Sequence, residues 1–592
     1  MTTPKPLRGG EFIIRDSVHT DVFIPEEFNE DQIMVKQMCH DFVAEIGEKS
    51  HILDAQVELM EKSGALGLLG AHIPEMYGGN PLDTNANTLI ADELGKAGGS
   101  FDTTFAAHIG IGMLPILYFG TDEQKKKYLP KLCTGEMKAA YCLTEPGSGS
   151  DALAAKTRAD LSPDGTQYIL NGQKMWITNA GFADLFTVFA KIGGEQFTGF
   201  IVEAKTPGIT LGAEEKKLGI KGSSTRQVFF ENVAIPVDNV LGKIGYGSQI
   251  AFNTLNIGRF KLGTMAMGGS KKCISIAVKY ANERIQFGQP IASFGAIKHK
   301  LGEMASLIFA LESATYRLSD MMGKHKDEAI GGGKFFEQAM LDAAKEFASE
   351  CAIIKVAGSE YLDYVIDEML QIHGGNGFSE EYPAARAYRD ARINRIYEGT
   401  NEINRLLLVD RIIKKALKGE LDLVGPAWAV QKELMSMAPK STDEGPWAAE
   451  HLAIQNFKKN MLLVAGAAVK YQMDGKHDLN NEQEVVMHIA DIGIDCFIAE
   501  SLLLRAEKLS SGSISHPAEV VKAITQLFIS EAQARVQKHS TDALMAFATG
   551  DELVIMLKGV KRFSNYPAVN TVHARRIIAD HLIAGNDYTL EF

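Results

Sequence analysis

One acidic side chain stands where it could transfer protons. Glu398 directly precedes Gly399, and the Thr400-Asn401 pair that follows can begin a helix. A carboxylate is one of the side chains that proteins use as a general acid or base. In isolation, such a loop acid is more often a solvated surface residue than a catalytic one.

Two earlier segments carry groups that could contact a ligand. Residues 141–151 (Tyr-Cys-Leu-Thr-Glu-Pro-Gly-Ser-Gly-Ser-Asp) combine glycines, which let backbone approach a ligand closely, with three hydroxyl side chains besides the tyrosine. Residues 174–179 place Trp176 and Thr178 on one face of a predicted strand. Taken alone, the first segment is a polar loop, and a buried Trp is more often core than a cofactor platform.

Two further segments lie at the ends of predicted helices. Arg284 ends a long helix, where its guanidinium either complements the helix C-terminus or binds phosphate. Residues 371–377 (Gln-Ile-His-Gly-Gly-Asn-Gly) break a helix with glycines, a pattern that capping also explains. Their spacing does not match a dinucleotide-binding fingerprint and no strand precedes them, which excludes a Rossmann site. The sequence contains no metal-ligand cluster, nucleophile elbow or Walker-type loop.

Composition narrows the class of protein. The chain has 592 residues, of which 45% are hydrophobic and 23% charged, so it should fold. Its net charge of −13, from 61 basic and 74 acidic residues, argues against a nucleic-acid binder. The six cysteines are too scattered for a disulfide scaffold or a zinc site.

The sequence also bears on cellular location. Residues 1–20 mix basic and acidic side chains and have no apolar segment typical of a secretion signal, which favours a cytoplasmic protein. Peripheral attachment to the inner face of the membrane stays open. The longest uncharged stretch, residues 103–121, contains His108 and Pro115, so a buried helix and turn is expected there.

The periodicity of apolar residues changes three times and predicts four domains. These are a helical domain over residues 1–138, a β domain over 139–245, a helical bundle over 246–418 and an additional helical domain over 419–592. The last should hold three or four helices. Gly425-Pro426 and residues 438–446 are expected to form a linker before them.

Particular patterns locate the elements. In the first domain, one helix face is predicted to carry Ile33, Met34, Met38, Phe42 and Ile46. In the β domain, Asn171-Gly172 predicts a hairpin turn between strands at 167–170 and 174–177, with further strands at 185–192, 198–204 and 226–231. Long helices are predicted at 250–283, 296–323 and 335–371, and one begins at Asn401.

In their order and separations, the five segments together resemble the acyl-CoA dehydrogenase family over residues 29–412. The extension to Phe592 resembles the long-form branch, the very-long-chain acyl-CoA dehydrogenase type. The resemblance implies a mainly α fold: an N-terminal helical domain, a middle β-barrel-like domain and a C-terminal four-helix bundle, followed by an additional helical domain. It also implies FAD as cofactor.

The resemblance assigns site residues by position. Those expected to contact FAD in one subunit are Tyr141, Cys142, Leu143, Thr144, Gly149, Ser150, Trp176, Ile177 and Thr178. Arg284, Gln286 and Phe287 would reach FAD across a subunit interface, Gln371, Gly374 and Gly375 would hold its adenosine side, and Thr400 and Asn401 its diphosphate. Residues expected near the substrate are Ser150, Asn256, Arg259 and Gly399, with Thr103 and Ala106 at the floor of the acyl tunnel.

The implied reaction is α,β-dehydrogenation of a long-chain fatty acyl-CoA, with Glu398 as the base and electrons passing to electron-transferring flavoprotein. Some branches place the base directly before the arginine that matches Arg259, but this chain has Gly258 there. An acyl-CoA oxidase using oxygen and an assembly or scaffold flavoprotein of a respiratory complex are the alternatives.

The resemblance further implies a homodimer in which the extension replaces a subunit contact. Membrane attachment through this extension is doubtful. The region that corresponds to the basic amphipathic stretch of long-form relatives, around residues 436–455, is short and contains Asp443, Glu444 and Glu450.

Overall fold

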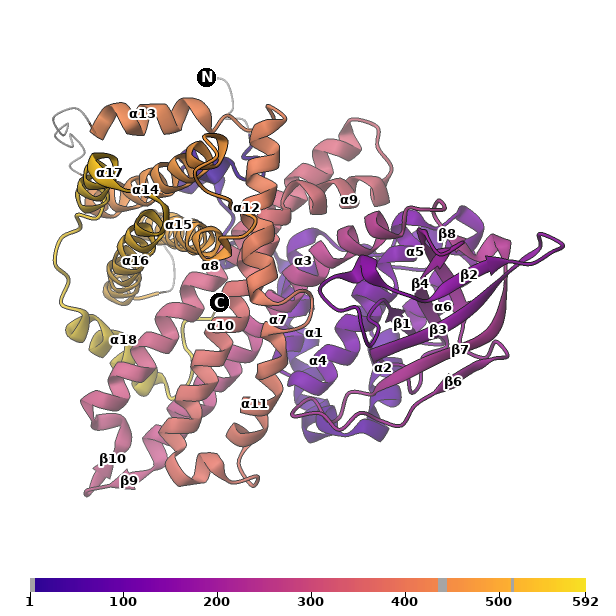
Figure 1. Cartoon of the computed structure of the whole chain (residues 1–592). Helices are drawn as coiled ribbons and strands as arrows, with labels where there is room; N and C mark the ends of the chain where they lie inside the picture. The colour runs from indigo at the N-terminus through magenta and orange to yellow at the C-terminus, as the bar shows by residue number, and fades with distance from the viewer. Residues whose placement is uncertain (1–5, 435–444, 513–515, 592) are drawn as a thin grey trace.

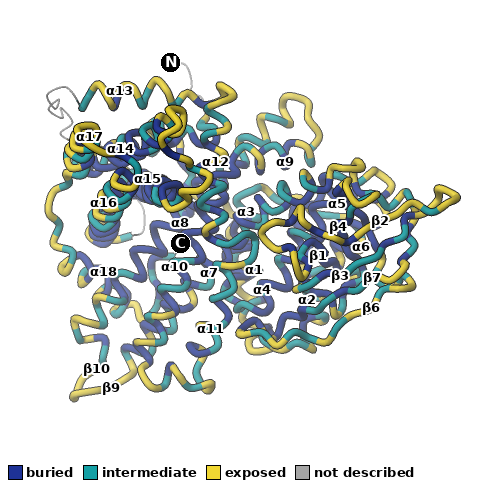
Figure 2. The backbone as a smooth tube through the Cα atoms, in the orientation of Figure 1, coloured by how far each residue is buried: buried dark blue, intermediate teal, exposed yellow. Residues whose placement is uncertain are grey.

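The computed structural model describes residues 6–434, 445–512 and 516–591 (Figure 1). A β-sheet lies at one end of the molecule and the C-terminal helices lie at the other. Long helices between them carry the most continuous buried backbone, whereas loop tips at the periphery are exposed (Figure 2). The predicted fold class, helical with a β domain and an additional helical region, is confirmed. Among the described helices, none has the length and apolarity needed to cross a membrane.

The first helices form the N-terminal region, of which α4 and η8 line the site that is described below. They are α1 (Glu30–Ile46), α2 (Gln56–Ala65), α3 (Thr84–Gly95), α4 (Gly99–Ala106), the π-helical turn η8 (Ala107–Gly112), α5 (Leu114–Phe119) and α6 (Asp122–Thr134). The last part of this series confirms a buried helix and turn within residues 103–121.

The predicted inner face of α1 is wrong in its first turn. Ile33 and Met34 are exposed, whereas Gln32 is buried together with Phe42 and Ile46. Gln32 is held inward because its amide donates hydrogen bonds of 3.1 Å to Asp83 at the start of α3. This contact orients the helix, and periodicity along α1 alone could not reveal it.

The β domain is an eight-stranded sheet in the order β6-β7-β3-β2-β4-β5-β8, with β1 paired in parallel to β4. Its strands are β1 (Ala139–Cys142), β2 (Arg158–Leu161), β3 (Gln167–Thr178), β4 (Leu185–Ile192), β5 (Gln196–Glu203), β6 (Ile209–Leu211), β7 (Thr225–Pro236) and β8 (Val240–Leu241). The strands predicted over 185–192, 198–204 and 226–231 correspond to β4, β5 and β7.

The predicted hairpin at Asn171-Gly172 is wrong. These residues lie inside β3, which runs unbroken past them and pairs antiparallel with β2 and β7. The register between β3 and β7 shifts there, and the Asn171 side chain accepts a hydrogen bond of 2.8 Å from the backbone N–H of Asn232. Gly172 is required because a Cβ would lie 2.5 Å from Thr157 Oγ1. The dipeptide forms a β-bulge, the other use of glycine within a strand.

Two glycines bring the central helices together. The bundle contains α7 (Gly247–Glu283), α8 (Gly295–Gly331), α10 (Ala348–His373) and α12 (Asn401–Leu417), with the shorter helices α9 (Phe336–Glu346) and α11 (Pro383–Ala391). A Cβ on Gly263 of α7 would lie 2.3 Å from the Ile354 carbonyl oxygen, and one on Gly358 of α10 would lie 2.6 Å from the Gly263 carbonyl oxygen. Only glycine permits this approach. The helix predicted over 335–371 is divided at Phe347 into α9 and α10.

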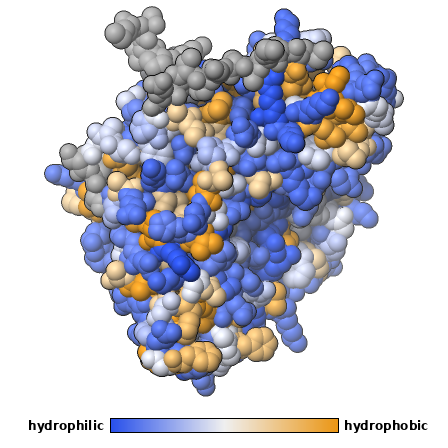
Figure 3. Space-filling view, turned by 90° about the vertical axis from the view of Figure 1, so that its left-hand side faces the viewer, coloured by the Kyte–Doolittle hydropathy of each residue, from blue (hydrophilic) through white to orange (hydrophobic). Residues whose placement is uncertain are grey.

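Six described helices follow residue 418, more than the three or four predicted. They are α13 (Val424–Leu434), α14 (Ala448–Met473), α15 (Gln483–Ser511), α16 (Ala518–Phe547), α17 (Gly550–Arg562) and α18 (Thr571–Gly585). Gly425-Pro426 belongs to the first turn of α13, so its assignment to a linker is wrong, since proline is tolerated in a first helical turn. Most of the other predicted linker, and Asp443 and Glu444 of the region weighed for membrane binding, lie outside the described residues. Figure 3 shows hydrophobic and hydrophilic side chains interspersed on the face nearest the C-terminal helices.

Buried charges tie these C-terminal helices to the rest of the chain. Arg505 of α15 is fully buried and contacts Glu26 at 2.6 Å and Glu312 of α8 at 2.7 Å. Lys271 of α7 also contacts Glu312, at 2.6 Å. Burial alone would raise the pKa of Glu26, but the Arg505 charge and hydrogen bonds from His516 and Arg505 hold it at about 2. The early segment containing Glu26 therefore packs against the C-terminal helices.

We expect Arg505→Met to lower the free energy of unfolding by about 3–5 kcal/mol, because it leaves two buried carboxylates without their guanidinium. Urea unfolding followed by circular dichroism measures the change. Lys538→Met is the control, since Lys538 pairs with Asp542 on the exposed surface of α16 and should leave the midpoint nearly unchanged. Equal midpoints for the two variants would contradict the role assigned to Arg505.

Candidate active site

Glu398 lines a cavity of about 70 Å³ between α4, η8, α7 and the loop that precedes α12. Thr103 and Ala106, the two predicted floor residues, line the same cavity, as does Thr178 at the end of β3. The structure thus brings together four segments that are far apart in the chain. Gly110 of η8 adds an open position, since a Cβ there would meet no atom within 4 Å.

Glu398 and Gly399 adopt successive left-handed backbone conformations, with φ of 59° and 82°. This conformation is costly for a glutamate and persists where surrounding contacts enforce it. The Arg259 guanidinium donates to the Glu398 carbonyl oxygen at 3.2 Å, and Lys355 donates to the Gly399 carbonyl oxygen at 2.8 Å. Asn404 donates to the same Gly399 oxygen at 2.7 Å. These three side chains fix the turn that aims Glu398 at the cavity.

The Glu398 carboxyl group occupies space that a side chain at position 258 would take. A Cβ on Gly258 would lie 2.8 Å from Glu398 Oε2 and 3.1 Å from Cδ. Oε2 is buried and makes no hydrogen bond within the described chain. Burial raises the pKa of Glu398 to about 7, although the Arg259 and Lys355 charges oppose the rise. The group can therefore gain or lose a proton near neutral pH.

A chain of hydrogen bonds runs from this turn to the C-terminal helices. Lys355 also donates to Asn401 Oδ1 at 2.7 Å, and the Asn401 amide donates to Glu360 at 3.0 Å. Glu360 accepts from Arg405 at 2.8 Å, and Arg405 donates to Asp491 of α15 at 2.7 Å. The added helices therefore support the loop that carries Glu398.

The loop after β1 is bound to β3 beside this cavity. The Met175 N–H donates to the Thr144 carbonyl oxygen at 2.9 Å. Lys174 and Glu145 form a buried ion pair of 2.7 Å, and Glu145 also accepts from the Lys156 and Thr157 backbones. Sequence reasoning missed this pair, although both residues stand inside the quoted motifs and opposite charges there were a usable signal.

An open, partly strained surface lies along these two segments. Trp176 has φ of 60° and is 54% exposed, which is unusual for a large aromatic side chain within a strand. Cβ atoms on Gly147 and Gly149 would meet nothing within 4 Å, and Ser150 is exposed. The Tyr141 hydroxyl is buried without a hydrogen-bond partner in the described chain. A planar, polar ligand could therefore pack on the exposed Trp176 indole and the open backbone of the two glycines, and could bind the unpaired Tyr141 hydroxyl.

Several predicted contact residues are buried, and their side chains are already used. Cys142, Leu143 and Ile177 are buried in or beside the sheet and could contact a ligand chiefly through backbone. Asn256 accepts a hydrogen bond of 2.8 Å from Arg259, and both are buried. With Asn401, which is also buried, these residues position the site. Thr400 caps α12 by accepting from the Ile403 N–H at 3.3 Å.

The remaining predicted cofactor residues gather elsewhere. Arg284, Gln286 and Phe287 lie on an exposed hairpin between β9 (Ile285–Gln286) and β10 (Gln289–Pro290), and the Phe287 ring is 94% exposed. Gln371, Gly374 and Gly375 are exposed nearby at the end of α10, where His373 stacks on Tyr280 at 4.0 Å.

This second group is remote from Glu398 in the same chain. From Arg259 to the end of α7 at Glu283 the helix rises about 36 Å. The two groups of predicted cofactor residues therefore lie at opposite ends of a long stretch of α7.

Sequence reasoning missed other residues of the cavity. Asp102 lines it, and burial raises the pKa of that carboxyl to about 7. The Tyr397 hydroxyl donates to Asn394 at 2.7 Å, and Lys261 stands one helical turn after Gly258. No sequence signal identified these residues, because periodicity alone does not show which helix faces meet. Among the described residues, no group of three or more His, Cys, Asp or Glu side chains could hold a metal ion.

Comparison with known proteins agrees with this architecture. Family models match in chain order: acyl-CoA dehydrogenase N-terminal domain over residues 29–136, middle domain over 140–233, and two models described as C-terminal domain over 245–413 and 456–562. A probable acyl-CoA dehydrogenase of Bacillus subtilis is 44% identical, covering 98% of each chain. The bovine mitochondrial very long-chain specific acyl-CoA dehydrogenase is 35% identical over 91% of this chain and 84% of its own.

A solved structure gives the same result. The crystal structure of an acyl-CoA dehydrogenase complexed with FAD from Bacillus anthracis superposes with a TM-score of 0.95 at 44% identity, covering 98% of this chain and all of that one. The resemblance seen in the sequence motifs is confirmed, and the chain belongs to the acyl-CoA dehydrogenase family.

Proposed function

We propose that this protein catalyses FAD-dependent α,β-dehydrogenation of long-chain fatty acyl-CoA to the trans-2-enoyl-CoA. The observation that carries the proposal is the Glu398 carboxyl group, buried against Gly258 in a cavity with an unpaired oxygen and a pKa near 7. Family membership and the FAD-bound relative from Bacillus anthracis support the flavin.

The residues present fit FAD. Trp176, the open glycines after β1 and the orphaned Tyr141 hydroxyl supply a platform and polar contacts for the flavin ring. The N-terminus of α12 beside Thr400 offers free backbone N–H groups for phosphate. Bound FAD would supply a hydride acceptor for the β-carbon.

This chain's own residues handle the α-proton. The Glu398 carboxylate would remove it, and the enolate oxygen that develops on the thioester then needs hydrogen-bond donors. The Glu398 backbone N–H donates no hydrogen bond within the described chain and could therefore donate one to the enolate oxygen. Arg259, Lys355 and Asn404 act only as positioning residues, because they hold carbonyl oxygens of the loop.

The electron acceptor is proposed to be electron-transferring flavoprotein. An oxidase would release peroxide instead, so measuring peroxide against reduction of that flavoprotein distinguishes the two. A purely structural role, as an assembly or scaffold protein, does not require the buried and strained base that this loop maintains.

We also propose a homodimer. The second group of predicted FAD residues, around Arg284, lies beyond the end of α7, a rise of about 36 Å from Arg259, which supports a site completed by another subunit. A partner subunit that presents its own exposed hairpin would supply the guanidinium for the FAD pyrophosphate. The solvent-exposed Phe287 at the hairpin tip supports this arrangement.

Glu398→Gln should retain FAD and acyl-CoA binding but lower the rate of flavin reduction by several orders of magnitude, because the amide keeps the shape and cannot accept a proton. Anaerobic stopped-flow absorbance after mixing with palmitoyl-CoA measures this rate. Reduction at the native rate would place the base elsewhere.

The rate should also depend on pH through Glu398. Only the deprotonated carboxylate accepts the α-proton, and its pKa is about 7 in the free protein. We therefore expect kcat/KM to rise as pH increases through about 7 and to level off above it. An acidic limb near pH 4.5, the ordinary range of a glutamate, would contradict the burial described for this group.

Gly258→Ala should displace the Glu398 carboxylate, since the new Cβ would lie 2.8 Å from Oε2. A displacement of about 1 Å can cost roughly 100-fold in rate. Gly269→Ala on the same helix is the matched control, because its nearest new contact is an ordinary 3.4 Å. Loss of kcat in the first variant only, with both retaining FAD, is the expected result.

Chain-length preference should follow the cavity floor. Thr103 and Ala106 are small, and each further buried methylene contributes about 0.8 kcal/mol, so kcat/KM for palmitoyl-CoA should greatly exceed that for butyryl-CoA. Ala106→Phe should move the optimum to shorter chains. An optimum that stays in place would show that another residue closes the tunnel.

A further inference from the structure

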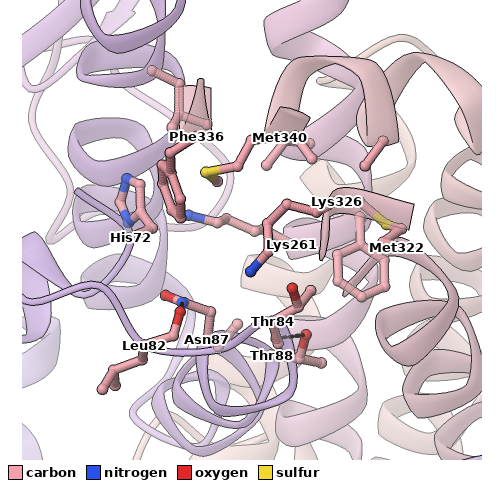
Figure 4. A pocket seen from close by; sticks show the side chains of 15 residues that line it. His72, Leu82, Thr84, Asn87, Thr88, Lys261, Met322, Lys326, Phe336 and Met340 are labelled. Carbon is pink, nitrogen blue, oxygen red and sulfur yellow. Dashed lines mark hydrogen bonds between the residues drawn. The ribbon is translucent and has the colours of Figure 1, made fainter. Parts of the chain in front are cut away.

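A second cavity of about 70 Å³ lies between α3, α7, α8 and α9 (Figure 4). Apolar side chains such as Leu114, Phe260 and Met340 form most of its wall. Three basic side chains also line it: His72, Lys261 and Lys326. No acidic side chain of the described residues is among those that line it.

Two of the three basic groups, Lys261 and His72, lack an acidic partner among the described residues. Lys326 contacts Asp327 at 3.4 Å, and its ammonium lies 5.6 Å from the centroid of the Phe336 ring. His72 is 3% exposed and neither ring nitrogen makes a close hydrogen bond within the described chain, although a contact with the Ile109 backbone partly opposes the lowering of its pKa by burial. Lys261 makes no ion pair or hydrogen bond with the described residues, and burial alone lowers its pKa to about 7.

An amine and an imidazole that face one apolar cavity without an acidic partner are unfavourable in the empty protein. Lys261 is half-buried, and its ammonium loses hydration where the side chain enters the cavity; a desolvated donor without an acceptor costs free energy. The two groups also interact electrostatically, because the Lys261 charge adds to burial in lowering the pKa of His72. Figure 4 shows them entering the cavity from different sides. An amine and an imidazole in one cavity are side chains that can bind a carboxylate, and no carboxylate of the described residues lines this cavity.

Lys261 connects this cavity with the one that contains Glu398, since its side chain lines both. It stands on α7 three residues after Gly258, which touches the Glu398 carboxyl, a rise of about 4.5 Å. Lys261 is therefore a shared wall of the two cavities, at which an acyl chain extending from Glu398 would enter the second one.

We propose that Lys261 and His72 bind a carboxylate at the far end of the acyl chain, so that the substrates of this enzyme include ω-carboxyacyl-CoA, the mono-CoA esters of α,ω-dicarboxylic acids. The inference rests on the proposed function. A terminal methyl group at the same place leaves the amine and imidazole unpaired, whereas a carboxylate accepts a charge-assisted hydrogen bond from each. The reaction at Glu398 is the same for both substrates.

The test uses the full-length, FAD-loaded enzyme and pairs of esters of equal carbon number: sebacyl with decanoyl, dodecanedioyl with lauroyl, and hexadecanedioyl with palmitoyl. The readout is the ratio of kcat/KM for the ω-carboxyl ester to that for its monocarboxylic partner. We expect this ratio to exceed unity for at least one pair, and Lys261→Met to lower it by about tenfold or more.

Two further variants complete the design. Lys272→Met, the same change at an exposed lysine of α7, should leave the ratio unchanged. His72→Phe should lower it by a smaller factor, and it also decides the matter if Lys261→Met fails to fold.

A ratio below unity for every pair, or one that neither variant moves, would overturn the inference while leaving the proposed function intact. So would saturable binding of free decanoate alongside acyl-CoA with the ratio unmoved, because the cavity would then hold a separate fatty acid. Failure of the monocarboxylic esters themselves to reduce the flavin would contradict the proposed function instead.

Discussion

The packing of the Glu398 carboxyl group against Gly258 is the constraint on which the site depends. It requires α7 to pass directly beneath the loop before α12, and it leaves no room for a side chain at that point of the helix. The same contact removes the carboxyl group from water, which raises its pKa to about 7. The position of the Glu398 carboxyl group, its raised pKa and the glycine at residue 258 thus all follow from the same packing contact.

That arrangement needs α7 to be fixed along its length. Glycines at 263 and 358 let α7 and α10 approach until their backbones are in contact. This contact fixes the position of Gly258 relative to the Glu398 loop. The loop is then held from the other side by Lys355 of α10. A rigid helix pair at the base of a site is more precise than a loop alone.

The added C-terminal helices take part in this support. Asp491 of α15 binds Arg405, which binds Glu360 and so reaches Asn401 and Lys355 beneath the active loop. Arg505 of the same helix is buried between Glu26 and Glu312. Such buried ionic contacts are costly when one partner is lost, so they fix where α15 lies on the bundle.

The sequence by itself determined the family, the fold class and the order of helical and β regions. It could do so because the five motif segments are short and continuous. Their order and separation can be recognised in the sequence without knowing any tertiary contact. Strands β4, β5 and β7 and the long helices were predicted from apolar periodicity, which indicates the type of a single element and which of its residues are buried. Glu398, Thr103, Ala106 and Thr178, named from the sequence, do line one cavity.

Only the tertiary structure decided which faces meet. Asn171-Gly172 forms a bulge because β7 and Thr157 lie beside it, and Ile33 and Met34 face outward because Asp83 draws Gln32 inward. Lys261, Asp102 and the Glu145–Lys174 pair became visible as site residues only when distant segments were brought together. Whether a charged side chain is solvated, paired or left without a partner depends on contacts between elements, and local sequence patterns do not encode those contacts.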